Sequence, residues 1–526
     1  MLKPYTGEWS FEQAAHLLRR TTFGATFKEI EDAVAQGMKA TVRQLLRNQV
    51  LPDPPVNYDY HDDPNVPING EWADAPHIDF RSNNARRRSL YGWTLMQMAH
   101  DRMSIREKMT LFWQSHFVVE TNVVQDAKFI YQYASTFRSQ ALGNFKELVE
   151  QVTVSPAMLR YLNGRDNTES APNENYAREL LELFTLGKGD LAAPGDYTTF
   201  TEEDVIVMAK VLTGWRDRFY YRREIRTLPT SFFRFAHHDK NDKQLSHRFD
   251  HAVIENNDDN EYKDLIDIIF QHPAASRFIC RRLYRWLVHF DISDEVKSEV
   301  IEPMSAILSA NDFNIKPVIR ALLQSEHFYA QDNIGAMVKS PVDFVMFSLN
   351  QFEVPFPENN LYRKYQLRFK LYQEMQDMQM EIFNPPNVAG WKAYYQQPLY
   401  YQSWISSATL PIRMNFTNRL ASQGLRFAGY DIKIDALAFV KTLSNPYSPN
   451  VLIADLAKLL FPHPISETQK EVLKEILIPG LPDFEWTVEY GNYISNPSDE
   501  NLKASVEQKL QNLLQRMMTM PEYYLQ

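Results

Sequence analysis

Apolar residues recur at helical spacing in one segment after another of this 526-residue chain. Residues 83–100 and 104–117 read as long apolar helices, residues 274–289 and 361–379 as further helices, and residues 504–518 as a clear amphipathic helix. Glycine is scarce, since 17 glycines are about half of the usual share of ~7%. We therefore predict a mainly α fold: a large multi-helix domain with a small β-hairpin insertion and a helical C-terminal section.

Breaks in the helical pattern divide the chain. Residues 51–76 contain six prolines, which indicates either a linker or a long surface wrap. Aromatic residues that alternate loosely with arginine predict the hairpin insertion at about residues 216–251. We expect a main helical domain over residues 1–420 and a smaller helical section, packed on it, over residues 421–526.

Charge and composition limit the partners and the compartment. The formal net charge of -10 disfavours nonspecific binding to nucleic acid, so no nucleic-acid partner is expected. No run of about 18 apolar residues occurs, so no membrane span is expected. The first residues lack an apolar signal core, which predicts a cytoplasmic protein; the alternative is an exported protein whose leader has been removed.

One stretch, residues 173–187 (NENYARELLELFTLG), reads as a complete helix with a charged face. Asn173 suits the N-cap, and Gly187 suits the position after the last turn. Tyr176, Leu180, Leu183 and Phe184 fall on one side. The other side carries the predicted polar site, which consists of Glu174, Arg178, Glu179 and Glu182.

This charged face has three interpretations. It can be a solvated ladder, in which each i, i+4 pair contributes only about 0.3–0.5 kcal/mol. It can be a buried structural network. It can also be a functional site, because three carboxylates around one guanidinium favour a metal, a cationic ligand or a raised carboxyl pKa. A divalent metal is therefore a candidate cofactor.

Three further residues are candidate metal ligands. His238 and Asp239 are of the types that suit zinc, iron or manganese, although an ordinary surface loop is the alternative. His116 lies among aromatic residues in the run FWQSHF, where a hydrogen-bonded core histidine is the alternative to a ligand. Cys280 is the single cysteine and lies in an apolar run, which predicts a buried, inert thiol.

A proline-rich loop is the last candidate. In residues 385–391 (PPNVAGW), the two prolines stiffen a loop that presents Asn387 and Trp391. Such a loop suits the wall of a cleft, and it suits ordinary loop packing equally. No Walker A motif, dinucleotide fingerprint or nucleophile elbow occurs in a fitting context, which disfavours kinases and nucleotide-dependent dehydrogenases.

The order of these motifs resembles the bacterial family catalogued as domain of unknown function 1800. The matching segments span nearly the whole chain: residues 14–24 (AAHLLRRTTFG), 112–117 (FWQSHF), 173–187, 212–216 (LTGWR), His238-Asp239 with Lys243, 339–341 (KSP), 385–391 and 521–523 (PEY). Gln114 stands where the family's motif commonly has a histidine. Residues 392–395 (KAYY) replace the family's glycine-rich stretch.

The resemblance implies a mostly helical protein without an assigned activity. Many members look exported, and a sulfatase-like second family is often encoded beside them, which implies a sulfatase-like partner protein. Polar residues within a family's signature are more often site residues than a solvated ladder would be. The resemblance therefore strengthens the functional interpretation of the signature helix, together with His238 and Asp239.

Two hypotheses follow. In the first, the protein is an enzyme with an acidic, metal-assisted hydrolytic site built on residues 174–182. Its expected catalytic residues are Glu174, Arg178, Glu179 and Glu182; its substrate-binding residues are Tyr176, Trp215, Asn387 and Trp391; and its candidate metal ligands are His238, Asp239 and His116. In the second, the protein binds or assembles with a partner protein or a glycan through an aromatic cleft, and the Glu/Arg network is structural.

Overall fold

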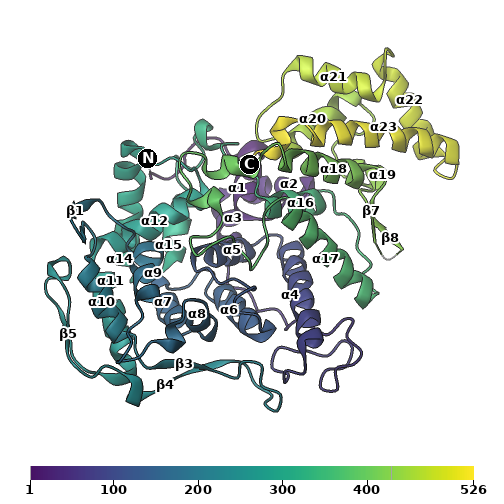
Figure 1. Cartoon of the computed structure of the whole chain (residues 1–526). Helices are drawn as coiled ribbons and strands as arrows, with labels where there is room; N and C mark the ends of the chain where they lie inside the picture. The colour runs from purple at the N-terminus through teal and green to yellow at the C-terminus, as the bar shows by residue number, and fades with distance from the viewer. Residues whose placement is uncertain (1, 428) are drawn as a thin grey trace.

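The computed structural model describes residues 2–427 and 429–526, and this part of the chain is predominantly helical (Figure 1). The first helices of the chain are α1 Phe11–Thr21, α2 Phe27–Gln36, α3 Met38–Leu45, α4 Phe80–His100, α5 Arg106–His116, α6 Ala127–Ser139, α7 Phe145–Thr153, α8 Pro156–Tyr161, α9 Glu174–Glu179 and α10 Glu202–Val211. The predicted mainly α class is confirmed.

The helices of the middle of the chain complete the main body. They are α11 Glu261–Gln271, α12 Pro273–Leu287, α13 Asp294–Val296, α14 Glu302–Ala310, α15 Ile315–Leu323, α16 Pro341–Asn350, α17 Leu361–Asp377 and α18 Thr409–Ala421. Helix α5 runs through the interior, and every one of its residues from Glu107 to His116 is buried. Because α5 has no solvent-facing side, its polar residues, such as Glu107 and Lys108, are buried together with its apolar ones.

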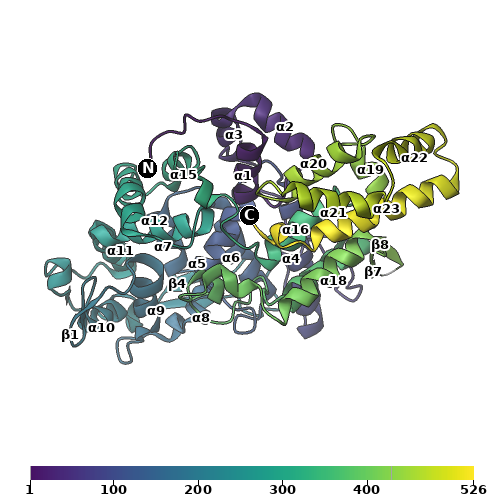
Figure 2. The same ribbon diagram turned by 90° about the horizontal axis from the view of Figure 1, so that it is seen from above.

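The last helices gather at one side of the molecule in both views (Figures 1 and 2). They are α19 Ala436–Val440, α20 Pro449–Leu460, α21 Glu467–Leu477, α22 Asp483–Ser495 and α23 Glu500–Met518. Helix α23 packs on α18, and α20 contacts α1. Helix α22 packs on α20 and α23 and buries Trp486, and the contact of α23 with α18 holds the end of the chain against the main body.

The strands form four small antiparallel pairs in the described part of the chain. They are β1 Leu191–Ala193 with β2 Asp196–Tyr197, β3 Trp215–Arg218 with β4 Thr230–Phe233, β5 Lys243–Gln244 with β6 Val253–Ile254, and β7 Leu425–Phe427 with β8 Tyr430–Ile432. The predicted hairpin corresponds to β3–β4, in which Trp215 lies opposite Phe233. The other pairs are too short for period-2 alternation to reveal them.

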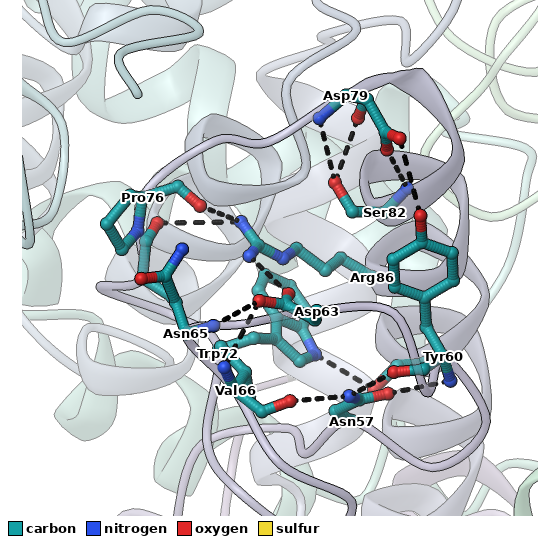
Figure 3. Close-up of polar contacts among 12 residues, drawn as sticks. Asn57, Tyr60, Asp63, Asn65, Val66, Trp72, Pro76, Asp79, Ser82 and Arg86 are labelled. Carbon is teal, nitrogen blue, oxygen red and sulfur yellow. Dashed lines mark hydrogen bonds and ion pairs between the residues drawn. The ribbon is translucent and has the colours of Figure 1, made fainter. Parts of the chain in front are cut away.

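Residues 51–79 wrap over the surface and are fixed by side chains, as Figure 3 shows. The Arg86 guanidinium donates to Asp63 Oδ2 at 2.8 Å and to Pro76 O at 2.9 Å. Asn57 Nδ2 donates to Val66 O at 2.8 Å, and the buried Trp72 donates to Ser89 Oγ at 3.0 Å. Of the two interpretations of this proline-rich stretch, the structure shows the surface wrap.

Two further observations concern the helices. None of the helices described for this chain has the length and apolar character needed to cross a bilayer. Cys280 of α12 is buried, and burial raises the pKa of its thiol above the ordinary value. The expected buried, unreactive cysteine is therefore what the fold contains.

Candidate functional site

The signature segment 173–187 begins as an α-helix and changes to a π-helix. The Asn173 side chain accepts a hydrogen bond from Asn175 N, so it is the predicted N-cap. Helix α9 then continues as a π-helical turn over Leu180–Thr185, and Gly187 follows with a φ of 78°. The expectation of one complete α-helix is corrected here, because the last turn uses i→i+5 hydrogen bonds.

His116 is joined to this π-helical turn. Its Nε2 lies 2.9 Å from Phe184 O, and the ring is buried among Phe112, Trp113 and Phe117. Burial, aided by the charge of Arg282, holds the pKa of His116 well below the ordinary value. The ring is therefore neutral near pH 7, and its Nε2–H donates to Phe184 O. This is the arrangement of a hydrogen-bonded core histidine, the alternative to a metal ligand.

Arg178 is the centre of a half-exposed network. Its guanidinium contacts Glu202 of α10 at 2.8 Å, Glu174 at 3.3 Å and Glu182 at 3.6 Å. The side chains in these pairs are between 19% and 45% exposed. Hydrogen bonding to Glu202 raises the pKa of Arg178, so the guanidinium stays charged. Arg178 therefore joins α9 to α10 through Glu202, a partner outside the predicted charged face.

Glu179 differs from its neighbours on this helix. Within residues 2–427 and 429–526, no hydrogen bond or ion pair holds its half-buried carboxylate. Burial, followed by the negative charge of Glu182, raises its pKa, although Arg178 opposes the shift. A partly buried carboxyl group with a raised pKa and no hydrogen-bond partner is of the kind that general acid–base catalysis uses.

Tyr161 lies close to Glu179. Its hydroxyl, at the end of α8, donates to Glu120 Oε1 at 2.6 Å. Burial, this hydrogen bond and the charges of Glu120 and Glu179 all raise the pKa of Tyr161. Glu120 follows α5 in a segment that meets the proline-rich loop, because Thr121 N donates to Phe383 O at 2.9 Å. Glu120, Tyr161, Glu179 and Glu182 therefore form the acidic site.

His238 and Asp239 lie in a different, fully buried network. His238 Nε2 is 2.9 Å from Glu261 Oε1, and its Nδ1 is 3.0 Å from Thr213 O. Lys243 Nζ donates to Glu261 Oε2 at 2.7 Å and also to Asp239 O. Both ring nitrogens of His238 are engaged by protein atoms, so this cluster fixes the loop after the hairpin to α11.

The candidate metal ligands are not brought together. His116 lies between α5 and the π-helical turn, whereas His238 and Asp239 lie between α10 and α11. In the part of the chain that the structure describes, no group of three or more His, Cys, Asp or Glu side chains is arranged to hold a metal ion. His116 therefore does not lie near enough to His238 and Asp239 to share one metal site with them.

The predicted substrate-binding residues also have separate surroundings. Tyr176 is buried and donates to Thr153 Oγ1 at 2.9 Å. Trp215 packs edge-on against Phe233 and Tyr262 in the hairpin. Asn387 donates to Tyr395 at 2.8 Å. Trp391 is 2% exposed and lines, with Trp404, a cleft of about 320 Å³.

Gly390 explains how the proline-rich loop approaches α5. Its φ is 93°, and a Cβ atom there would lie 2.9 Å from Ser115 O. Only glycine accommodates both conditions without displacing the backbone. This contact places the loop beside the end of α5 from which the chain leads to Glu120.

A buried charged centre around Asp343 was not anticipated. Asp343 pairs with Lys108 and accepts from Ser340 Oγ at 2.9 Å. Lys339 donates to Tyr523 O at 2.6 Å, and Arg413 donates to Lys339 O at 3.0 Å. The positive charges of four buried residues interact with Asp343: Arg20, Lys108, Lys339 and Arg413.

Several nitrogens of this Asp343 centre have no hydrogen-bond partner in the part of the chain that the structure describes. Nε and Nη1 of both Arg20 and Arg413 are buried without a hydrogen bond. Burial lowers the pKa of each of these guanidinium groups to about 10. The sequence signal is limited to the presence of Arg20 and Lys339 within two of the signature segments, residues 14–24 and 339–341.

Comparison with known proteins agrees with this arrangement of the motifs. No curated protein and no protein of solved structure matches the chain. The model of one family, described as "Protein of unknown function (DUF1800)", matches residues 16–525. That range holds every signature segment described above apart from the first two residues of the earliest one, so the chain belongs to the DUF1800 family.

Proposed function

We propose that this protein is a hydrolytic enzyme in which Glu179 is the acid–base group. The observation that supports this function is the half-buried Glu179 carboxylate, which has a raised pKa and no partner in the described part of the chain. The surrounding signature carboxylates are paired, so Glu179 is the member of the charged face that is free to exchange a proton.

In this proposal, Glu179 takes a proton from water as the water oxygen adds to the substrate. It then returns that proton to the leaving group, so that one bond to water oxygen forms and one substrate bond breaks. Glu182 maintains the raised pKa of Glu179, and Arg178 fixes Glu182 and α10 in place. The Tyr161 hydroxyl beside Glu179 donates its proton to Glu120, so its oxygen accepts a hydrogen bond from the substrate.

The test is a hydrolysis screen with p-nitrophenyl esters, phosphates, sulfates and glycosides. Loss of an acid–base group lowers kcat by about 10²–10⁴-fold, so Glu179→Gln should remove activity while the melting temperature stays near that of the wild type. Glu203→Gln, an exposed neighbour on α10, is the matched control. Full activity in Glu179→Gln, or no hydrolysis of any substrate class, would contradict the proposal.

Elemental analysis separates the metal-free from the metal-assisted form of this proposal. A near-stoichiometric divalent metal in the wild-type protein, lost in a Glu179→Gln/Glu182→Gln double variant, would add a metal to the acidic site. If activity persists in metal-free protein, Glu179 acts without a metal.

A second candidate function is a binding or assembly protein. It is supported by the paired Arg178 network, which joins α9 to α10, and by the cleft beside Trp391 and Trp404. Indole rings with nearby amide groups, such as Gln379 and Asn384, suit a glycan or a partner protein. The family resemblance suggests a sulfatase-like protein as that partner.

Calorimetric titration with a purified sulfatase-like protein tests this second candidate. Lys392→Glu changes an exposed residue of the cleft and should weaken binding, whereas Lys39→Glu on α3 should not. Equal affinities of both variants and the wild type would exclude the cleft as the contact surface.

A further inference from the structure

A cleft of about 560 Å³ lies between α3, α5, α6 and α15. All charged residues that line it are cationic: Arg47, Arg106, Arg138 and Lys316. The whole chain has a formal net charge of -10, so a cleft without a lining carboxylate differs from the average surface. Such a local excess of positive charge attracts anions.

The helices that form this cleft meet at their ends. Arg47 lies two residues after the end of α3, and Arg106 is the first residue of α5. Helix α15 begins at the cleft with Ile315, whose N–H donates to Gly143 O, and α3 contacts α15 (Figure 2). The C-terminal ends of α3 and α6 also reach the cleft, near Arg47 and Ser139, and offset the helix dipoles of α5 and α15, so the positive charge of the cleft comes from its side chains.

Arg138 and Arg106 form the rigid inner wall of the cleft. Arg138 is buried and bonds Glu107 through Nε at 2.7 Å and Nη2 at 2.8 Å. Its Nη1 is buried and has no hydrogen-bond partner in the described residues. Arg106 Nε lies 3.1 Å from Asp101 and 3.5 Å from Glu107. The carboxylates of Asp101 and Glu107 thus neutralise the charges of these two guanidinium groups. The Nη1 group of Arg138 makes no hydrogen bond within the described residues.

The two outer cations have no such balance. Arg47 is exposed and, among the residues described, has no ion pair. Lys316 Nζ donates to the neutral side chain of Asn48 at 3.1 Å. Burial and the nearby charge of Arg320 lower the pKa of Lys316, as is typical of an ammonium group without a counter-ion. The outer cleft therefore carries about two positive charges without a protein partner.

We propose that this cleft binds a small ligand that carries two or more phosphate or sulfate groups. Guanidinium and ammonium groups are the side chains that bind tetrahedral oxyanions in proteins. The cleft is larger than one such anion, and its cations lie on four different elements, which suits a ligand with several charged groups. The cleft is at the start of α5, whereas the acidic site follows the end of that helix, so this inference goes beyond the proposed enzyme.

Calorimetric titration of the full chain at low ionic strength tests this inference with two probes. Inorganic tripolyphosphate represents a phosphorylated ligand, and a disulfated disaccharide represents a sulfated one. We expect one probe to bind with a stoichiometry near one and to weaken steeply with added salt. The probe that binds more tightly identifies the source of the anionic groups.

Charge reversal locates the binding. Arg47→Glu and Lys316→Glu should each weaken binding of that probe by about tenfold or more, because a favourable contact becomes a repulsive one. Arg43→Glu is the matched control: it lies one turn earlier on α3, is exposed, and does not line the cleft. The melting temperatures of all three variants confirm that each protein is folded.

Two results would overturn the inference. The first is that neither probe binds at about 1 mM, a concentration that detects even weak complexes. The second is that Arg43→Glu weakens binding as much as Arg47→Glu, which would show a response to overall charge rather than to the cleft.

Discussion

Asp343 and Arg178 are each the centre of a charged network, but the two networks have opposite surroundings. Around Asp343, the interacting cations are buried, and several of their nitrogens have no hydrogen-bond partner among residues 2–427 and 429–526. Around Arg178, three carboxylates share one guanidinium at the half-exposed surface. The first network is short of negative charge in a dry interior, whereas the second has an excess of negative charge in contact with water.

This difference separates the roles of the two regions. Removing one partner from a buried ion pair leaves a desolvated charge, which costs much more than losing a surface pair. The Asp343 centre should therefore control folding. The Arg178 network is half-exposed, so we expect it to contribute little to stability. The half-buried Glu179 carboxylate beside it, with its raised pKa, is instead a candidate functional group.

The largest expected effect is that of Asp343→Asn. The substitution leaves Lys108 buried without a carboxylate, so we expect the free energy of unfolding to fall by about 3–5 kcal/mol. Chemical unfolding followed by fluorescence measures it. Asp32→Asn, which removes an exposed i, i+4 partner of Lys28, is the control and should change little. Equal stability of both variants would remove the contrast between the two networks.

The second prediction concerns pH and Lys339. Burial, with the charges of Arg19 and Arg413, holds the pKa of Lys339 well below its ordinary value. Folding therefore releases a proton, and stability should rise with pH from the folded pKa up to the unfolded value of about 10.4. Lys339→Met should lose this rise, and melting temperatures from acidic to alkaline pH will show it. The exposed Lys458→Met is the control, and parallel pH profiles of all three proteins would disprove the assignment.

A smaller effect is expected for Glu202→Gln. It removes the shortest contact of Arg178, but the pair is half-exposed, so the loss should be below about 1 kcal/mol. Added salt should shrink the difference further, because it screens surface charges. Thermal melts at low and high salt measure it, with Glu203→Gln as the control. If Glu202→Gln lowers the free energy of unfolding as much as Asp343→Asn does, the Arg178 network is as important for folding as the Asp343 centre.

The smallest effect is the pH dependence that Glu179 gives to stability. Since its folded pKa is raised, folding takes up a proton, and stability falls as pH rises from the unfolded value of about 4.3 through the folded pKa. Glu179→Gln should lack this fall and be slightly more stable at neutral pH. Because the side chain is half-exposed, the gain should be well under about 1 kcal/mol. Reduced stability of the variant at pH 7 would show that Glu179 has a structural partner.

Local chemistry explains what could be predicted from the sequence. The Asn173 cap, Gly187 and the buried face of α9 follow from capping preferences and helical spacing, and the structure contains them. The π-helical turn could not be predicted in this way. Its widened hydrogen bonding accompanies a contact between Phe184 and His116, which lie 68 residues apart in the sequence.

Partners from distant segments account for the rest. The sequence identifies His238 and Asp239 as polar candidates. Glu261, which engages Nε2 of His238, lies 23 residues further on in α11, where no sequence motif marks it. The cationic cleft likewise combines residues from four elements, and none of them belongs to a recognisable motif. The type of a residue therefore does not predict its role by itself. The role depends on which residues from distant segments contact it in the tertiary fold.

The buried thiol of Cys280 can be used to measure how often the interior around α12 opens. It lies at the core-facing side of α12, two residues before Arg282, and its thiol is both covered and held in its protonated form. A thiol reagent can react only in molecules whose α12 has transiently separated from its neighbours. The modification rate of the single cysteine thus reports how often this helix opens in otherwise native protein.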